Sequence, residues 1–213
     1  MKKITPFLFA VPMSLHGFTV STANLVNPDA TAVPILLPSG EAIPSGTGSV
    51  AVGYFDTLTN TQLMTSNDSS LIFDDFVQFS GIDSEQAFTP TVGADGFFSL
   101  SFEDEIPQGG NDFTGQTIYI FIGNDITLES STHFALYDSG EEFGEDNVVG
   151  LGFANAFITD PASGLIRGKS VEDADIDLGV IFNTAIELER IPEISSSMLI
   201  TLSLGALGFR RRR

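Results

Sequence analysis

Thr117-Ile118-Tyr119-Ile120-Phe121-Ile122-Gly123 is the stretch that decides the fold. Side chains alternate between the two faces of a β-strand, so the three isoleucines share one face while Tyr119 and Phe121 share the other. Both faces are therefore apolar. Because a strand that is apolar on both faces must be covered on both sides, this segment is predicted to lie in the middle of a β structure.

Alternating apolar side chains predict further strands on both sides of this segment. Gly, Asp and Asn residues separate them, as in the turns of antiparallel sheets. The predicted strands cover residues 33–37, 49–55, 97–102, 132–138, 148–157 and 180–189. Residues 70–79 follow a polar run and carry apolar side chains at spacings of three and four, which predicts one short helix. A strand is the alternative there, because Phe and Val suit either period.

This pattern predicts an all-β fold, an antiparallel β-sandwich with one short helix. Immunoglobulin-like and jelly-roll-like connections are both open, because the sequence does not order the strands within the sheets. The sandwich domain is expected over residues 46–190. Residues 24–45 are rich in proline, which predicts a linker or a loosely held first strand.

The N-terminal residues have the pattern of an export signal. Lys2-Lys3 give a positive start, residues 4–20 are mostly apolar, and Ser21-Thr22-Ala23 supplies the small residues that a signal peptidase requires. We therefore predict a signal peptide over residues 1–23, cut between Ala23 and Asn24. Prolines and a histidine interrupt the apolar run, which leaves room for the cut to shift by a few residues.

The C-terminal end combines a short apolar run with a block of positive charge. As a helix of about 1.5 Å rise per residue, residues 195–209 would be about 22 Å long. These 15 residues are fewer than the roughly 20 that cross a bilayer comfortably. Arginines that follow an apolar segment stay on the cytoplasmic side. The tail is therefore predicted to be a hydrophobic transmembrane helix that anchors the chain temporarily, and a permanent membrane anchor is the alternative.

The order of Pro192-Glu193, an apolar helix and Arg210-Arg211-Arg212-Arg213 resembles the PEP-CTERM sorting signal. Ile194 stands where that family has its second proline. The resemblance covers residues 191–213 and implies cleavage near the Pro-Glu motif by an exosortase, a membrane-embedded protease. It also implies a Gram-negative bacterium that makes exopolysaccharide, export through the Sec translocon, a transient inner-membrane anchor and delivery to the cell surface.

Between the two terminal signals the chain is strongly acidic. All 28 acidic residues lie within residues 24–193, whereas Arg167, Lys169 and Arg190 are the only Lys or Arg residues in that range. Such a surface repels nucleic-acid phosphates, so nucleic acid is not expected as a partner. The acidity is typical of saline surroundings, of cation binding or of a domain selected for solubility. The absence of cysteine excludes disulfides, thiolate metal sites and a cysteine nucleophile.

The best candidate for a metal site is the run that contains Asp173, Asp175 and Asp177. In an extended chain these three carboxylates share one face, about 6.5–7 Å apart. Calcium prefers oxygen ligands and would relieve their repulsion. The alternative is a solvated acidic face. An EF-hand is excluded, because Leu178 occupies the position that needs glycine.

The remaining candidates for catalysis are two acidic runs and one histidine. Residues 103–105 and 141–146 offer paired carboxylates of the kind that hydrolyse glycosidic bonds, and His133 is a candidate general base. The alternatives are solvated loops, including an acidic loop over residues 139–147, and a structural histidine. No nucleophile elbow, phosphate-binding loop or dinucleotide fingerprint is present. No catalytic residue is therefore predicted.

The sequence thus predicts an exported, C-terminally sorted protein of the cell surface or exopolysaccharide matrix, structural or adhesive and not an enzyme. The first alternative is a carbohydrate-binding module, assisted by calcium. Its aromatic platform would have to use Tyr54, Tyr119 and Tyr137, because the chain has no tryptophan. The second alternative is a secreted hydrolase. No cofactor besides calcium is expected.

Overall fold

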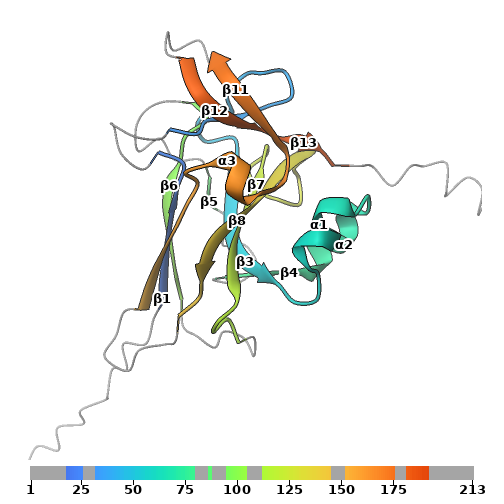
Figure 1. Ribbon diagram of the computed structural model, residues 1–213, viewed down its shortest axis with the longest axis vertical. Helices are drawn as coiled ribbons and strands as arrows, with labels where there is room; N and C mark the ends of the chain where they lie inside the picture. Colours follow the sequence, from blue (N-terminus) through green and yellow to red (C-terminus); the bar gives the residue numbers. More distant parts are fainter. Residues whose placement is uncertain are drawn as a thin grey trace, which may run out of the picture.

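The computed structural model describes residues 18–25, 32–79, 86–87, 95–104, 112–144, 152–175 and 181–191. These residues form a mostly β structure with three sheets, mainly antiparallel, and short helices (Figure 1). The described strands are β1 (Phe18–Ala23), β2 (Ile35–Leu36), β3 (Ser49–Phe55), β4 (Phe76–Gln78), β5 (Gln86–Ala87), β6 (Ser99–Asp104), β7 (Thr117–Gly123), β8 (His133–Glu142), β9 (Gly152–Phe157), β10 (Leu165–Arg167), β11 (Lys169–Asp175), β12 (Ile181–Glu187) and β13 (Glu189–Arg190). The described helices are α1 (Asn60–Thr65), α2 (Ser69–Asp75) and α3 (Pro161–Gly164).

The largest sheet is built around β7, the segment that the sequence places at the centre. Its strand order is β10-β8-β7-β3-β4, with β13 also pairing with β8 and β5 with β3. β7 runs antiparallel to both of its neighbours, β3 and β8. Residues 118–123 are all buried, on both faces of the strand. The prediction of a central strand covered on both sides is confirmed.

A second sheet covers one face of this central sheet. Its order is β6-β1-β9, and β1 is antiparallel to β6 but parallel to β9. The main hydrophobic core lies between the two sheets. It contains Ile118, Ile120 and Ile122 from β7 together with Phe18 and Val20 from β1. Figure 1 shows β1 and β6 side by side on the flank opposite the helices.

Helices α1 and α2 cover the other face of the central sheet (Figure 1). Leu63 of α1 and Ile72 of α2 are fully buried against Phe121 and Phe134 of the sheet. Thr59 begins α1 with a capping box, in which its hydroxyl accepts from the Gln62 amide and the Gln62 side chain accepts from the Thr59 amide. The two faces of β7 thus meet a sheet on one side and helices on the other.

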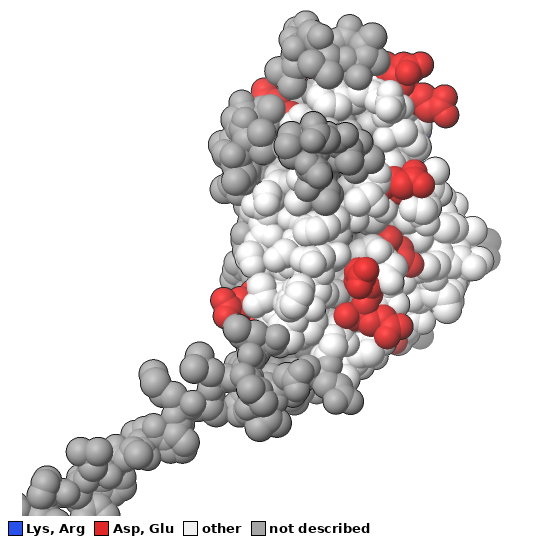
Figure 2. All heavy atoms as spheres, turned by 60° about the vertical axis from the view of Figure 1, so that its left-hand side comes forward, with Lys and Arg blue, Asp and Glu red and all other residues white. Residues whose placement is uncertain are grey.

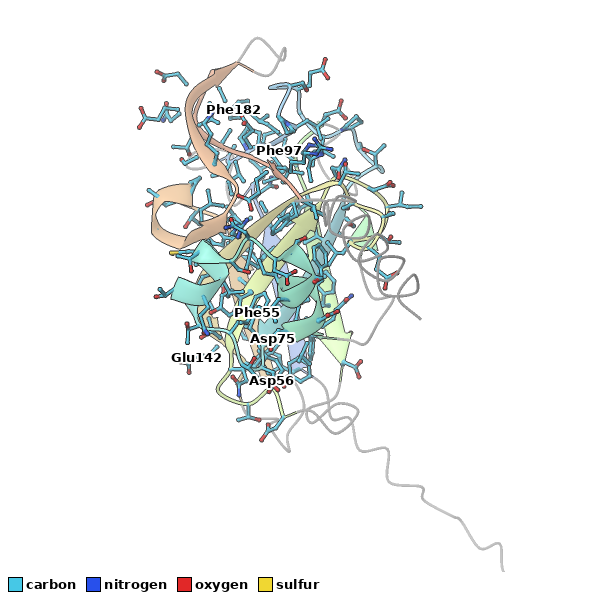
Figure 3. All side chains as sticks on the ribbon, turned by 90° about the vertical axis from the view of Figure 1, so that its right-hand side faces the viewer. Phe55, Asp56, Asp75, Phe97, Glu142 and Phe182 are labelled. Atoms are coloured by element: carbon cyan, nitrogen blue, oxygen red, sulfur yellow. The ribbon has the colours of Figure 1, made fainter. Side chains whose placement is uncertain are left out.

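A third sheet, in the order β11-β12-β2, closes one end of the molecule. It has its own small core of Leu36, Phe97, Ala174 and Ala185. Figure 3 shows Phe97 and Phe182 together at this end, with ring centroids 5.5 Å apart. The pairing of β12 with β2 is parallel, as is that of β1 with β9, so the antiparallel expectation holds for most but not all strand pairs.

Four phenylalanine rings pack together in the main core, near the ends of its strands. The rings of Phe79, Phe113 and Phe143 contact one another at centroid distances of 5.1–5.3 Å. Phe18 joins them at 6.4 Å from Phe79 and 5.9 Å from Phe143. Tilted and edge-on arrangements of this kind add to the free energy gained by burying the ring area. This cluster does the packing that tryptophan does in other cores.

Three local predictions need correction. The acidic loop expected over residues 139–147 is wrong at its start, because β8 continues to Glu142 and Phe143 is buried in the main core. The helix expected over residues 70–79 ends at Asp75, and the next three residues form β4, so the predicted helix and its alternative strand both occur. Three short helices are described where one was expected.

The phenylalanine cluster makes a testable prediction about stability. Phe143→Ala removes a buried ring from contact with three others, and it should lower the free energy of unfolding by about 3–5 kcal/mol. The matched control is Phe153→Ala, because Phe153 is 68% exposed on β9 and its loss should change the free energy by about 0.5 kcal/mol or less. Urea denaturation of both variants measures this difference. Equal effects of the two substitutions would contradict the core described here.

Candidate functional site

The predicted sorting signal lies outside the described residues. This applies to Pro192, Glu193, the apolar run 195–209 and Arg210, Arg211, Arg212 and Arg213. Within the described part of the chain, no helix is both long enough and apolar enough to span a bilayer. The sorting signal therefore stays a prediction from its residues.

The predicted signal-peptide cut lies within folded structure. Residues 18–23 form β1, and Ala23 is only 5% exposed. The next residue, Asn24, is fully buried. Its side-chain amide donates to the carbonyl oxygens of Val33, at 2.9 Å, and Gly96, at 2.7 Å, and its side-chain oxygen accepts from the Phe98 amide at 2.8 Å. The sequence predicts the bond between Ala23 and Asn24 as a peptidase site, while the structure gives both residues a place in the fold.

The predicted calcium site lies only partly within the described residues. Asp173 and Asp175 lie on β11, and Asp177 lies outside the described residues. Asp173 has a φ of 53°, in the left-handed region, so the backbone there is not extended as the prediction assumed. Among the described residues, no three His, Cys, Asp or Glu side chains are grouped to hold a metal ion. The Asp177 part of the prediction is not tested.

His133, the only histidine between the predicted terminal signals, lies next to a hydroxyl group. His133 begins β8, and its Nδ1 lies 3.0 Å from the Thr132 hydroxyl. Its backbone amide donates to the Asn124 side chain at 2.8 Å. Asn124 also accepts from the Thr132 amide, so this side chain closes the turn between β7 and β8. These contacts match the structural alternative for His133.

The acidic runs lie at the ends of strands in different sheets. Glu103 and Asp104 end β6, while Glu141 and Glu142 end β8. Glu105, Glu145 and Asp146 are outside the described residues. Figure 3 shows Glu142 on the same half of the molecule as Asp75, an acid with a clear structural role. The Asp75 carboxylate accepts from the amides of Thr57 and Leu58 and from the Thr57 hydroxyl, which fixes the turn after β3.

A polar group that the sequence did not reveal joins α1 to the central sheet. The Tyr119 hydroxyl donates to the side-chain oxygen of Asn60, and the Asn60 amide donates to Asp138 at 2.8 Å. Burial, and secondly the negative charge of Asp138, raises the pKa of Tyr119 to about 12. These contacts among Asn60, Tyr119 and Asp138 keep the Tyr119 phenol protonated and position the first turn of α1. Its residues are 59 and 78 positions apart in sequence, so no local pattern predicts it.

Arg167 is a second connection that the sequence missed. Its guanidinium pairs with Glu189 and donates to the carbonyl oxygens of Leu63, at 3.1 Å, and Ser66, at 2.6 Å. It also lies 5.5 Å from the centre of the Phe134 ring, a cation–π distance. With only 11% of its side chain exposed, this arginine ties the C-terminal end of α1 to β10 and β13. Arginine suits this position better than lysine, because its planar guanidinium can donate to Glu189, Leu63 and Ser66 at once.

The three tyrosines do not form an exposed aromatic platform for sugars. Tyr54, Tyr119 and Tyr137 are 5%, 8% and 3% exposed, and all three pack in the cores. The Tyr137 hydroxyl donates to the Asp160 carbonyl at 3.1 Å, so it is also engaged inside the fold. None of the three presents a ring face to a ligand.

The outer face of the β6-β1-β9 sheet offers a different aromatic. Phe153 of β9 is 68% exposed, the most exposed large apolar side chain among those described. The next outward residue on β9 is the exposed Asn155, which lies beside Ser21 of β1, and Ser21 in turn lies beside the exposed Ser101 of β6. We define these four residues as the outer face. Ala154 and Ala156, which alternate with these residues on β9, point inward and belong to the main core.

Comparisons of the whole chain with protein-family models, curated proteins and solved structures found no match. The resemblance of the tail to a sorting signal therefore depends on the residues of the tail alone.

The Asn60–Tyr119–Asp138 group predicts a pH dependence of stability. Tyrosine in the unfolded chain loses its proton near pH 10, whereas Tyr119 in the folded protein holds it to about pH 12. A group whose pKa is raised on folding adds stability below the unfolded value and loses it as the pH rises through the folded value. The free energy of unfolding should therefore fall between pH 10 and pH 12.

Tyr119→Phe provides the control for this titration. It should reduce the fall in stability over that pH range but not abolish it, because burial and the charges of Asp56 and Asp112 also raise the pKa of Tyr54. Asp138→Asn removes the negative charge and should move the Tyr119 titration to lower pH. Denaturant midpoints and ultraviolet absorbance of the phenolates measure both effects. An unchanged pH profile in Tyr119→Phe would contradict the assignment.

Proposed function

We propose that the protein is an exported surface or exopolysaccharide-matrix protein, sorted by its C-terminal tail, with a structural or adhesive role rather than a catalytic one. The observation that carries the proposal is the order of the tail, in which Pro192-Glu193, an apolar run and Arg210 to Arg213 follow one another. The positive and apolar start of the chain supports the same route.

Export would use the Sec translocon, and the tail would hold the chain in the inner membrane until an exosortase-like protease acts near Pro192-Glu193. The released domain would then reach the cell surface or the matrix. We further infer that this domain is a β-sandwich, since the main core lies between β6-β1-β9 and the central sheet. Immunoglobulin-like and jelly-roll-like descriptions of its connections both stay open.

The surface charge supports a role outside nucleic-acid binding. Figure 2 brings forward the flank that carries β1 and β6, with acidic side chains at the margins of an uncharged area and no basic side chain in view. The bases that the domain does have are engaged. Arg167 pairs with Glu189, and Lys169 lies 3.7 Å from Glu187. The net field of such a surface repels polyanions.

The sorting proposal predicts the fate of altered tails. Replacing Arg210 to Arg213 by serines removes the charges that stop translocation, and deleting Pro192-Glu193 removes the motif for the protease. In the native host, both changes should deplete the protein from the surface, and the deletion should leave it in the inner membrane. Cell fractionation and labelling of intact cells measure the distribution.

The matched control is Lys169→Ser, which removes a base whose side chain is 68% exposed but lies outside the tail. This variant should be delivered normally. Unchanged surface delivery of both tail variants would contradict the proposal.

A carbohydrate-binding role is the second candidate, and the outer face favours it. Sugar rings combine apolar faces with hydroxyl groups, so they bind where an exposed aromatic adjoins hydrogen-bonding side chains. Phe153, Asn155, Ser21 and Ser101 provide this combination on one side of the β6-β1-β9 sheet. Because the exposed Glu103 lies in the same cross-strand row as Phe153 and the chain is strongly acidic, the chemistry fits a neutral glycan better than a polyanionic one. Calcium at Asp173 would act elsewhere, since β11 belongs to another sheet.

This candidate predicts that Phe153→Ala weakens binding to a neutral glucan by about 3- to 10-fold, the equivalent of losing one aromatic contact. Ile126→Ala is the control, because Ile126 is 62% exposed in the turn between β7 and β8 and is not part of the outer face. Affinity electrophoresis in gels with neutral glucan or alginate gives the readout. Equal migration of the wild type in gels with and without glucan would contradict the carbohydrate-binding role.

A further inference from the structure

We infer that β1 belongs to the mature exported domain, so that the export signal is removed upstream of Phe18 and not between Ala23 and Asn24. The inference rests on the proposed export of the protein. It concerns the place of proteolytic processing, and it replaces the boundary that the small residues Ser21-Thr22-Ala23 predict. Three features of β1 support it: its pairing, its packing and the surroundings of Asn24.

β1 is the middle strand of its sheet and is paired along its whole length on both sides. Its register runs from Phe18 opposite Asp104 to Ala23 opposite Ser99 on β6, and from Phe18 beside Gly152 to Ala23 beside Phe157 on β9. β6 and β9 do not pair with each other. Without β1 the sheet would lose its centre, and both flanking strands would expose unpaired backbone groups.

The inward side chains of β1 are part of the main core. Phe18, Val20 and Thr22 are 1%, 0% and 1% exposed. The Phe18 ring contacts Phe79 and Phe143, so the aromatic cluster at the end of the core includes β1. Removal of the strand would take Phe18 and Val20 out of this core and expose the apolar side chains that they cover, which is unfavourable in water.

The surroundings of Asn24 are incompatible with a chain end at this residue. Its backbone amide donates to the Phe98 carbonyl at 3.3 Å, and the residue is fully buried. Cleavage before Asn24 would convert this amide into a charged ammonium group beside the Phe98 carbonyl, and a buried charge without a counter-ion is strongly unfavourable. The cut would also remove the Ala23 carbonyl, which accepts from the Ile158 amide at 2.9 Å.

The fold also explains why residues 19–23 have the small-residue pattern of a signal-peptidase site. Thr19 and Ser21 are half-buried on the outer side of the sheet, while Val20 and Thr22 point into the core, so the segment has the alternation of a strand. Ala23 is small and buried where the chain leaves the sheet. A β-strand thus explains the small residues Ser21-Thr22-Ala23 without a peptidase site.

The direct test is the N-terminus of the exported full-length gene product. The protein is isolated from the surface fraction, and its first residue is determined by terminal sequencing and intact-mass measurement. The expected form has lost Lys2-Lys3 and part of the apolar start but keeps residues 18–23, so that its first residue is at or before Phe18. A form that begins at Asn24 would overturn the inference. A chain that is never exported contradicts the proposed function alone, and a second measurement then decides the place of β1.

The second measurement compares Val20→Asn with Thr19→Asn in the purified full chain. Val20 is fully buried and Thr19 is not, so only the first variant should lose cooperative unfolding and resistance to protease. If Val20→Asn does not fold, the milder Val20→Ala should still lower Tm by about 5–10 °C relative to Thr19→Ala. Indistinguishable curves for the pair at positions 19 and 20 would show that β1 is not part of the fold, and would overturn the inference.

Discussion

The burial of β7 on both faces is the constraint on which the rest of the structure depends. Its isoleucines need one apolar layer, and Tyr119 and Phe121 need another. The chain supplies the first layer with the β6-β1-β9 sheet and the second with α1 and α2. In a protein without cysteine, this apolar burial is the main source of cohesion, since no disulfide assists it. A strand with a polar face would need only one of these layers.

Charge has a smaller, more local role. The acids outnumber the bases between the predicted terminal signals, so ion pairs cannot hold the domain together in general. Among the described bases, Arg167 instead fixes α1 to the central sheet, whereas Lys169 makes an exposed contact within the third sheet. Arg167 ties α1 to β10 and β13, and Lys169 with Glu187 joins β11 to β12. None of the described Asp or Glu side chains is fully buried.

The sequence predicts best where a residue's neighbours in sequence decide its environment. The strands at 49–55 and 117–123 were predicted with the bounds that the structure gives, because their alternation is strong. Strand β1 was missed, because a strand and a signal peptide share an apolar, small-residue composition. Large and small side chains alternate along β9, and the sequence did not predict which of the two kinds faces the core. In the structure the small Ala154 is buried and the large Phe153 is exposed. The positive φ of Asp173, the sheet order and the Asn60–Tyr119–Asp138 contacts depend on distant residues, which local patterns do not encode.

Backbone hydrogen exchange in the native protein tests the central claim most directly. If apolar burial on both faces of β7 organises the fold, then the amides of residues 118–122 should be among the slowest to exchange, and should exchange only when the whole domain unfolds. The paired amides of β3 and β8 should follow the same global event, while those of the peripheral β13 exchange sooner. Exchange of β7 at the rate of β13 would contradict the account.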